Sequence, residues 1–246
     1  MRLACSAVVV LLGLAVCEAR ADGMLYKLPK DGASATFEFD AAIKMDADKQ
    51  MRMKGTMRMA SVGRTTEDGQ PCRWIEVTFE AKAEGGDLPA PKEGIKEIAK
   101  ILVPEKFLAK GQSPLEHVVR AWRQTGKGQP REMKDAANID NGPLPVLLAG
   151  PLKDAKALEK AEVESKLGKL ACEGQSGNLE LKGNRDMVFK ARLETRLHDD
   201  APFGVVGSRW TMEVTEKDGQ GSMKMDWNLK LIDVGDKATS EIPDAK

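Results

Sequence analysis

Methionine is the residue in this chain whose type and spacing most suggest chemistry. Four methionines between positions 51 and 59 share one face of an extended strand, because side chains on a strand alternate between its two faces. Thioether sulfur is a soft ligand for Cu(I), and Met223 and Met225 could extend such a site. The spacing is also typical of a core or an adaptable apolar surface, since methionine is flexible and apolar and no histidine lies nearby. We favour the apolar role and predict no metal and no other cofactor. The four methionines are Met51, Met53, Met57 and Met59.

The N-terminus has the features of a secretory signal peptide. A basic residue precedes an apolar run that is shorter than the roughly 20 residues of a transmembrane helix. A small-x-small motif ends at Ala21, so we expect residues 1–21 to be removed as a signal peptide. Lipoprotein processing at Cys17 is the alternative, but Val16 is a poor match to the residue that precedes a lipidated cysteine. We expect an exported protein, periplasmic or extracellular, without a transmembrane anchor, because no second long apolar segment follows.

Two cysteines, Cys72 and Cys172, remain after removal of residues 1–21. An even pair in an oxidising compartment favours a disulfide. It would close a loop of about 100 residues, for which the chain-entropy model gives a stabilisation of about 4.7 kcal/mol. Two separate buried thiols are the alternative. Neither cysteine belongs to a C-x-x-C motif, so the sequence gives no support to redox catalysis.

The sequence lacks the usual signatures of catalysis. Its two histidines, His117 and His198, do not have the spacing of a zinc site, and no Gly-x-Ser-x-Gly elbow or phosphate loop occurs. Glu76 and Glu80 alternate along a predicted strand, which is typical of a solvated face. Basic and acidic residues number 38 each and are interspersed, so nucleic acid is not an expected partner. We therefore predict that the protein is not an enzyme.

Most of the chain shows the alternating pattern of strands with one buried face. Residues 34–45, 51–59 and 72–82 predict three consecutive antiparallel strands joined by polar turns. The pattern returns in the last third of the chain after a central segment of different character. There a hairpin is predicted at 165–181, and strands are predicted at 187–197, 205–216 and 222–234.

The central segment 92–123 carries the clearest helical pattern. Ile95, Ile98 and Leu102 recur at helical spacing, and Pro104 would end that helix. Ser113-Pro114-Leu115-Glu116 has the form of a capping box before a second apolar stripe that ends at Trp122. Gly150-Pro151 predicts the start of a third helix, with Leu152, Ala155 and Leu158 facing inward. We therefore predict an α+β fold in one domain of residues 22–246: a curved antiparallel sheet, or incomplete β-barrel, covered by a central helical insertion at about 92–162.

Two connecting segments are predicted to be irregular. Residues 124–142 are polar and contain glycine, which predicts a mobile loop. Residues 144–150 are apolar and contain a proline. Their composition favours either a buried connection under the helices or an apolar flap over a cavity.

The segments 167–174 (LGKLACEG) and 201–206 (APFGVV) carry a family resemblance. With them the chain resembles uncharacterised exported bacterial proteins that are loosely similar to the periplasmic lipoprotein-carrier (Lol-type) superfamily. The resemblance implies an incomplete antiparallel barrel that is closed by a helical insertion and encloses an apolar cavity for acyl chains. The arginine that those carriers use inside the cavity has no assigned counterpart here, so no functional residue is carried over.

Together these patterns predict an exported, non-enzymatic binding protein that holds an acyl chain or another apolar ligand between sheet and helices. The alternative is a structural or protein-interaction module of the cell envelope, in which the same surface is ordinary core and the partner binds a sheet edge or residues 124–142. The expected partner is a lipid or lipoprotein acyl chain, or else an envelope protein. The residues predicted to line the ligand site are Met51, Met53, Met57, Met59, Ile98, Leu102, Val119 and Trp122.

Overall fold

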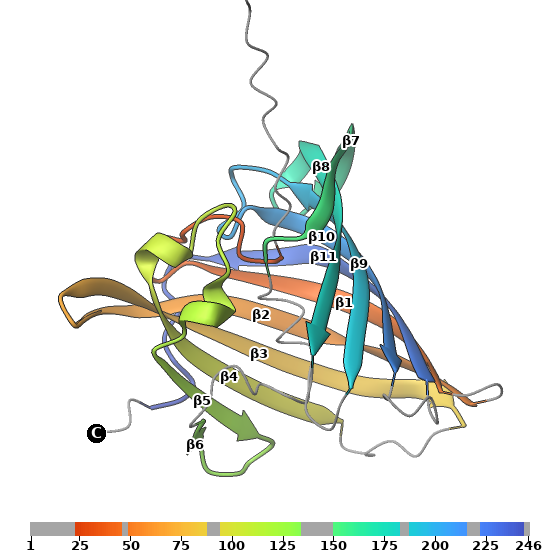
Figure 1. Cartoon of the computed structure of the whole chain (residues 1–246), viewed down its shortest axis with the longest axis horizontal. Coiled ribbons are helices and arrows are strands. Elements are labelled where there is room, and N and C mark those ends of the chain that lie inside the picture. The colour runs from red at the N-terminus through yellow and green to blue at the C-terminus, as the bar shows by residue number, and fades with distance from the viewer. Residues whose placement is uncertain are drawn as a thin grey trace, which may run out of the picture.

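The computed structural model describes residues 23–45, 49–87, 94–133, 150–182, 187–215 and 222–243. Over these ranges the chain forms one antiparallel sheet of eleven strands in the order β6-β5-β4-β3-β2-β1-β11-β10-β9-β8-β7. The sheet curves into a trough, with β1 in the middle of the order and β6 and β7 at its two ends (Figure 1). Within the described ranges β6 and β7 are not paired with each other, so the sheet is open there.

Apart from β6 and β7, strands that follow one another in the chain pair with one another, and one long-range pairing joins β1 to β11. Two 3-10 turns, η1 (Glu105–Phe107) and η2 (Pro114–His117), lie between β4 and β5. The strands are β1 (Ser34–Met45), β2 (Lys49–Glu67), β3 (Gln70–Gly86), β4 (Ile95–Pro104), β5 (Arg120–Thr125), β6 (Arg131–Glu132), β7 (Lys153–Ser165), β8 (Gly168–Lys182), β9 (Val188–Leu197), β10 (Val205–Thr215) and β11 (Ser222–Gly235).

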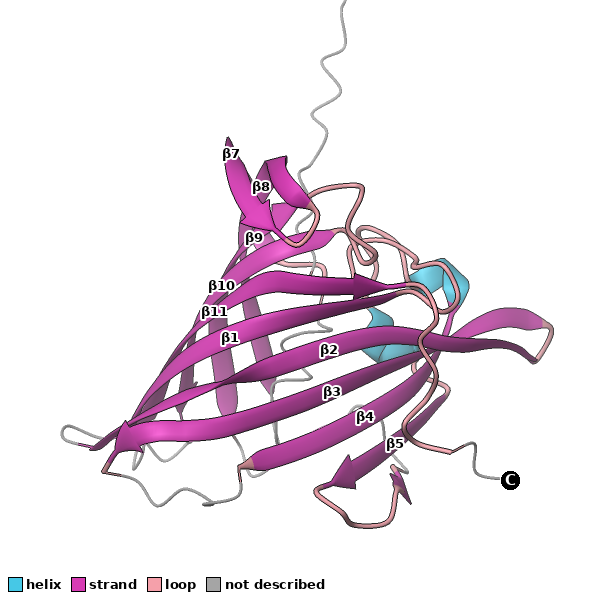
Figure 2. Cartoon of the chain, turned by 180° about the vertical axis from the view of Figure 1, so that it is seen from behind, coloured by secondary structure: helices cyan, strands magenta, loops and turns pink. Residues whose placement is uncertain are grey.

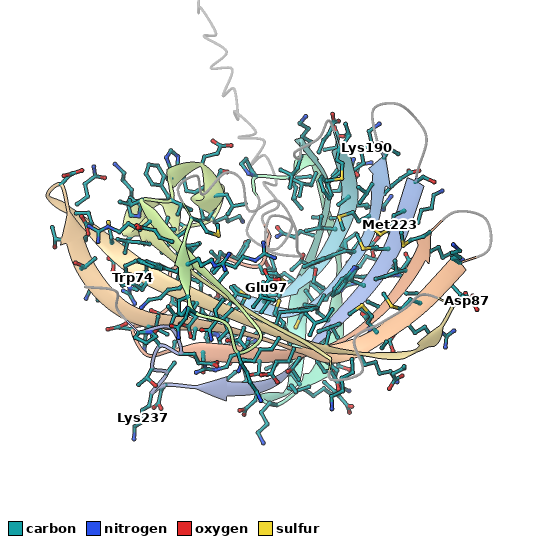
Figure 3. The ribbon with its side chains drawn as sticks, turned by 90° about the horizontal axis from the view of Figure 1, so that it is seen from below. Trp74, Asp87, Glu97, Lys190, Met223 and Lys237 are labelled. Carbon is teal, nitrogen blue, oxygen red and sulfur yellow. The ribbon has the colours of Figure 1, made fainter. Side chains whose placement is uncertain are left out.

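Alternation along these strands gives the sheet an apolar concave face. Residues that pair across an antiparallel sheet have their side chains on the same face. Once one residue is known to lie on the concave or the convex face, its partners on the neighbouring strands lie on that face too. Glu97 pairs with Phe79 and lies inside the curve of the sheet, whereas Lys237 lies on the opposite, convex side (Figure 3). The largest buried side chains of the concave face belong to one core cluster: Phe37, Phe39, Met57, Phe79, Trp210 and Trp227.

One end of the trough is filled by three segments that are distant in the sequence. Met24 and Leu25 precede β1, Leu108 follows η1, and Phe203 lies in the turn between β9 and β10. All four side chains are buried. The backbone N–H of Tyr26 donates to the carbonyl oxygen of Phe203 at 3.1 Å, which fixes two of these segments together. Figure 2 shows both 3-10 turns at this end of the sheet.

The predicted helical insertion is wrong. Across the described parts of the chain no α-helix occurs, and the stripe from Ile95 to Leu102 lies on strand β4. From Glu97 onward every residue of β4 is buried, on both faces of the strand. A strand that is covered on both sides has no polar alternation, so its apolar residues also fit a helical template. The second predicted helix is replaced by η2, where Ser113 makes no side-chain capping bond, and by β5, which contains Trp122.

The third predicted helix is also wrong, because residues 153–165 form the edge strand β7. The fold is therefore nearly all-β rather than α+β, and no helical insert occupies the described part of 92–162. The leader 1–21, the apolar segment 144–149 and the second half of the loop 124–142 lie outside the described residues. No helix among the described residues is both long enough and apolar enough to cross a bilayer.

Candidate functional site

Four aromatic rings form the floor at the centre of the concave face. Phe39 and Phe79 stack with ring centroids 4.7 Å apart and an interplanar angle of 14°. Trp227 lies 5.1 Å from Phe39, and Trp210 lies 6.2 Å from Trp227. Gly55 of β2 pairs with Phe39 and has no side chain, so the rings from β1 and β3 can meet across the intervening strand. The sheet thus carries a continuous apolar floor.

Methionines continue this floor toward the end of the trough that lies away from Met24 and Phe203. Met225 pairs with Met212, and Met223 pairs with Met45. Exposure rises along this direction, from 8% at Met225 to 39% at Met45. Methionine is flexible and polarizable, so these side chains can adapt to the shape of an apolar surface. The concave face therefore changes from packed core at one end to an accessible apolar rim at the other. Partly buried apolar side chains at this rim include Met51, Ile95, Leu181, Phe189 and Met223.

One ion pair lies on the concave face beside the aromatic floor. The Arg123 Nη2 group donates to Glu97 Oε2 at 2.9 Å, and Arg123 Nε lies 2.9 Å from Glu97 Oε1. Glu97 pairs in the sheet with Phe79, so the charged pair borders the aromatic cluster directly. A cleft of about 520 Å³ opens beside Arg123 at the β5–β6 edge. The cleft is lined by Arg123, Thr125, Gly128, Gln129, Arg131 and Met133.

Two buried side-chain donors on the concave face have no hydrogen-bond partner among the described residues. They are Trp227 Nε1 and Gln175 Nε2. The neighbouring Trp210 Nε1 does have one, since it donates to Ser208 Oγ at 2.5 Å. A buried polar group that lacks a partner costs about 1–3 kcal/mol. A ligand with an acceptor oxygen at either donor would recover that free energy.

The structure brings together only some of the residues predicted to line the ligand site. Met51, Met53, Met57 and Met59 all belong to the concave face, where Met57 pairs with Phe37 and Phe79. The other four predicted residues lie elsewhere. Ile98, Leu102 and Trp122 lie on the convex face, as the pairing of Trp122 with Lys100 and of Leu102 with Trp74 shows. Val119 is 45% exposed and precedes β5.

The residues predicted to line the site lie on two different faces because the segment predicted as a helix is the strand β4. Ile98 and Leu102 share a face in either structure, but on β4 that face points away from the trough. Residues of the concave face that the sequence analysis did not single out are Phe39, Phe79, Trp210, Met212 and Trp227. All five lie on segments whose alternating pattern predicts strands, and this pattern is the sequence feature that could have identified them as residues of the buried face.

Cys72 and Cys172 are both free, buried thiols in the structure, so the predicted disulfide is not confirmed. Cys72 lies on β3 and Cys172 on β8, with five strands between them in the sheet order. Burial raises the pKa of both thiols, although the charge of Arg196 acts weakly in the opposite direction at Cys172. Protonated, buried thiols are poor nucleophiles and poor metal ligands.

The two histidines make local contacts. His117 stacks on Phe107 with ring centroids 3.4 Å apart, and His198 Nδ1 accepts a hydrogen bond from the backbone N–H of Asp200. Within the described ranges no three His, Cys, Asp or Glu side chains are grouped so that they could hold a metal ion.

Comparisons with known proteins find only weak similarity, and it is to the folds of solved structures. No protein-family model and no curated protein matches the chain. Among solved structures, a protein described as a lipoprotein from Parabacteroides distasonis is 7% identical, with a TM-score of 0.32 over 87% of this chain and 99% of its own. The LolA superfamily protein NE2245 from Nitrosomonas europaea is 11% identical, with a TM-score of 0.30 over 90% of this chain and 92% of its own. The loose similarity to the lipoprotein-carrier superfamily is confirmed to that extent, and at these TM-scores it carries no argument about function.

Proposed function

We propose that this chain binds an acyl chain or a similar apolar ligand along its concave face, without catalysis. The observation that carries the proposal is the apolar face that runs from the aromatic floor to an accessible methionine rim. The floor itself is buried, and the rim is the part of this face that stays accessible; exposed apolar patches often mark sites of ligand binding. The rim includes Met45, which is 39% exposed, although its neighbours toward the floor are buried.

The dimensions of this face suit a long, narrow ligand. From Phe39 to Met45 the strand β1 covers about 20 Å at about 3.4 Å per residue. Along this length the concave side chains of β1 and its neighbours are apolar, including Ala41, Ile43 and Met225, except for Lys49, which pairs with Met45 at the rim. An acyl chain lying parallel to β1 would contact side chains from several strands at once. Its polar end could reach the Trp227 N–H or the ion pair of Glu97.

The proposal includes export to the periplasm or the extracellular space after removal of residues 1–21. The sequence pattern of the leader supports export. Intact mass of the purified, exported protein would give a chain beginning at Asp22. A mass that includes acyl groups on Cys17 would replace this with lipoprotein processing.

The experiment for ligand binding is organic extraction and mass spectrometry of protein that is exported and purified without detergent. We expect about one acyl species per chain. Replacing Met51 by Asp places a charge at the half-buried rim and should remove the bound species. The matched control is Arg52→Asp, since Arg52 is the next residue along β2 and is exposed on the convex face. An extract from the folded wild-type protein that contains no acyl species would contradict the proposal.

The same experiment separates this proposal from the alternative of a structural or protein-interaction module of the envelope. That alternative predicts an empty extract and an unchanged fold in both variants. The open edge at β7 would then be the first surface to test, because its outer side has no strand partner in the described sheet.

A further inference from the structure

The C-terminal segment Ser240–Ile242 lies across the convex face of β3, outside the proposed ligand site. The carboxylate of Glu76 accepts four hydrogen bonds from this segment. Ser240 Oγ donates at 2.6 Å, the backbone N–H of Glu241 donates to both oxygens at 3.0 and 3.2 Å, and that of Ile242 donates at 3.3 Å. One side chain of the sheet therefore holds two successive main-chain N–H groups of an extended segment.

A lysine completes this recognition of the main chain. Lys100 Nζ donates to the carbonyl oxygen of Ile242 at 3.1 Å and also lies 4.9 Å from the centre of the Trp74 ring. Glu76 and Lys100 pair across β3 and β4, and they are only 1% and 2% exposed. Charged residues are almost never this deeply buried unless they are paired. Here both charges are directed at the main chain of the C-terminal segment.

The side chains of the segment are also recognised. Glu241 accepts from Thr78 Oγ1 at 2.9 Å and from Lys96 Nζ at 2.8 Å, and Arg58 lies 4.0 Å away. Ile242 is 1% exposed. The convex face thus offers cations for an acidic side chain and a buried position for the aliphatic side chain that follows it. It also offers two charged side chains, Glu76 and Lys100, as partners for the main-chain groups of these two residues.

We infer that the convex face of β3 and β4 is a peptide-recognition site that the chain's own C-terminal segment occupies in cis. Its partner in trans is an extended segment of another protein that presents an acidic residue followed by an aliphatic one. The occupying residues follow the last strand, β11, which ends at Gly235, so they can leave without unpairing any strand of the sheet. Main-chain recognition combined with side-chain pockets is a general way of binding extended peptides.

The tethered segment should hide the site from weak partners. A short tether gives an effective concentration on the order of millimolar. For a free peptide with a Kd near 10 μM, competition from the tethered segment would weaken binding by roughly 100-fold. Exchange of partners at this face is therefore expected only after the C-terminal segment is displaced.

The test uses a fluorescent peptide with the sequence of residues 239–246 and the full-length protein. In the double variant Glu241→Lys/Ile242→Asp, the tethered segment no longer fits the site. We expect this variant to bind the peptide by anisotropy at least 10-fold more tightly than the wild-type chain does. A peptide that carries the same two changes is the matched control and should not bind. Adding Glu76→Gln to the double variant should abolish binding of the wild-type peptide.

Three results would overturn the inference. The first is a folded double variant that binds no peptide. The second is a double variant that does not fold, because the segment would then be an integral part of the domain. The third is dimerisation of the wild-type chain that the double variant loses, which would make a second copy the partner. Hydrogen exchange of the wild-type chain gives an independent measure: the amides of Glu241 and Ile242 should exchange faster than those of β3, and equal rates would contradict a separable segment.

Discussion

Replacing Glu105 by Gln is predicted to destabilise the protein at neutral pH and to have little effect in acid. Glu105 Oε1 accepts from Arg73 Nη2 at 2.7 Å and from Arg73 Nε at 3.1 Å. Arg73 is 4% exposed, and its Nη1 group donates to Pro29 O and to Ser61 Oγ, both at 3.0 Å. This one guanidinium therefore joins the segment before β1, strand β2 and η1.

The expected loss follows from these contacts. A hydrogen bond to a charged group contributes about 1.5–3 kcal/mol, whereas a neutral one contributes about 0.5–1.5 kcal/mol. Gln at position 105 keeps one acceptor for Arg73 but removes the charge that neutralises it. Arg64, 3.0 Å away, is largely exposed and adds little. Replacing a charged hydrogen bond by a neutral one leaves a difference of about 1–1.5 kcal/mol, so we expect Glu105→Gln to lower the free energy of unfolding at pH 7 by about this amount.

The pH dependence has a definite sign. The hydrogen bond from Arg73 lowers the pKa of Glu105 below 4.5, burial opposes this shift, and Arg64 supports it. A carboxyl group with a lowered pKa in the folded state stabilises the fold above its unfolded pKa, and this contribution is lost as the pH falls through the folded pKa. The difference between wild type and variant should therefore shrink below pH 4.5.

Urea unfolding of both proteins at pH 7 and at pH 3.5 measures this difference, with the exposed residue Glu116 changed to Gln as the control. The control should match the wild type at both values. A difference for Glu105→Gln that is the same at both pH values would refute the assignment of Glu105 as the partner of Arg73.

Three other predictions test separate parts of the structure. Phe79→Ala should lower the free energy of unfolding by about 3–5 kcal/mol by urea titration, and Phe79→Leu by less than about 1.5 kcal/mol, because Phe79 is buried and leucine fills most of the space that alanine leaves empty; equal losses would contradict the burial of this side chain in the core. In the chain without residues 1–21, Cys72 and Cys172 should resist thiol reagents while the protein is folded, since burial raises the pKa of both thiols. Both thiols should react once the protein is unfolded in urea, and no reaction in urea would establish a disulfide. Burial raises the pKa of Glu241, but hydrogen bonds from Lys96 and Thr78 outweigh it, so the net pKa lies below the ordinary 4.5. Amide exchange at residues 241–242, corrected for intrinsic rates, should therefore accelerate as the pH falls below 4.5 and through this lowered pKa; a pH-independent rate would rule this out.

The strands with one buried face could be predicted from the sequence. The predicted strand at 34–45 coincides with β1, and the predicted strands at 51–59 and 72–82 fall within β2 and β3. On these strands polar and apolar residues alternate because only one face is covered. The methionines of β2 were placed on a common face for the same reason.

Strand β4 could not be recognised in this way. Its concave residues meet the core, and on its convex side Lys96 and Lys100 contact the C-terminal segment, where Ile242 is buried. No local pattern in residues 95–104 shows that a segment about 140 positions later will cover them. Ile98 and Leu102 were assigned to the ligand site because both faces of β4 are buried, so its apolar residues also fit the stripe of a helix that covers the sheet. The aromatic floor depends likewise on the pairing of β1 with β11, which joins residues nearly 190 positions apart.

The four tryptophans allow the most direct test that a ligand lies on the concave face. Trp210 and Trp227 are on that face, whereas Trp74 and Trp122 are on the convex one. A variant with phenylalanine at positions 74 and 122 reports on the concave face, and a variant with phenylalanine at positions 210 and 227 reports on the convex face. Fluorescence is then titrated with a brominated fatty acid, whose bromine quenches tryptophan at close range. We predict saturable quenching in the first variant and little in the second. Equal quenching in the two variants, or quenching in the second alone, would contradict binding in the trough.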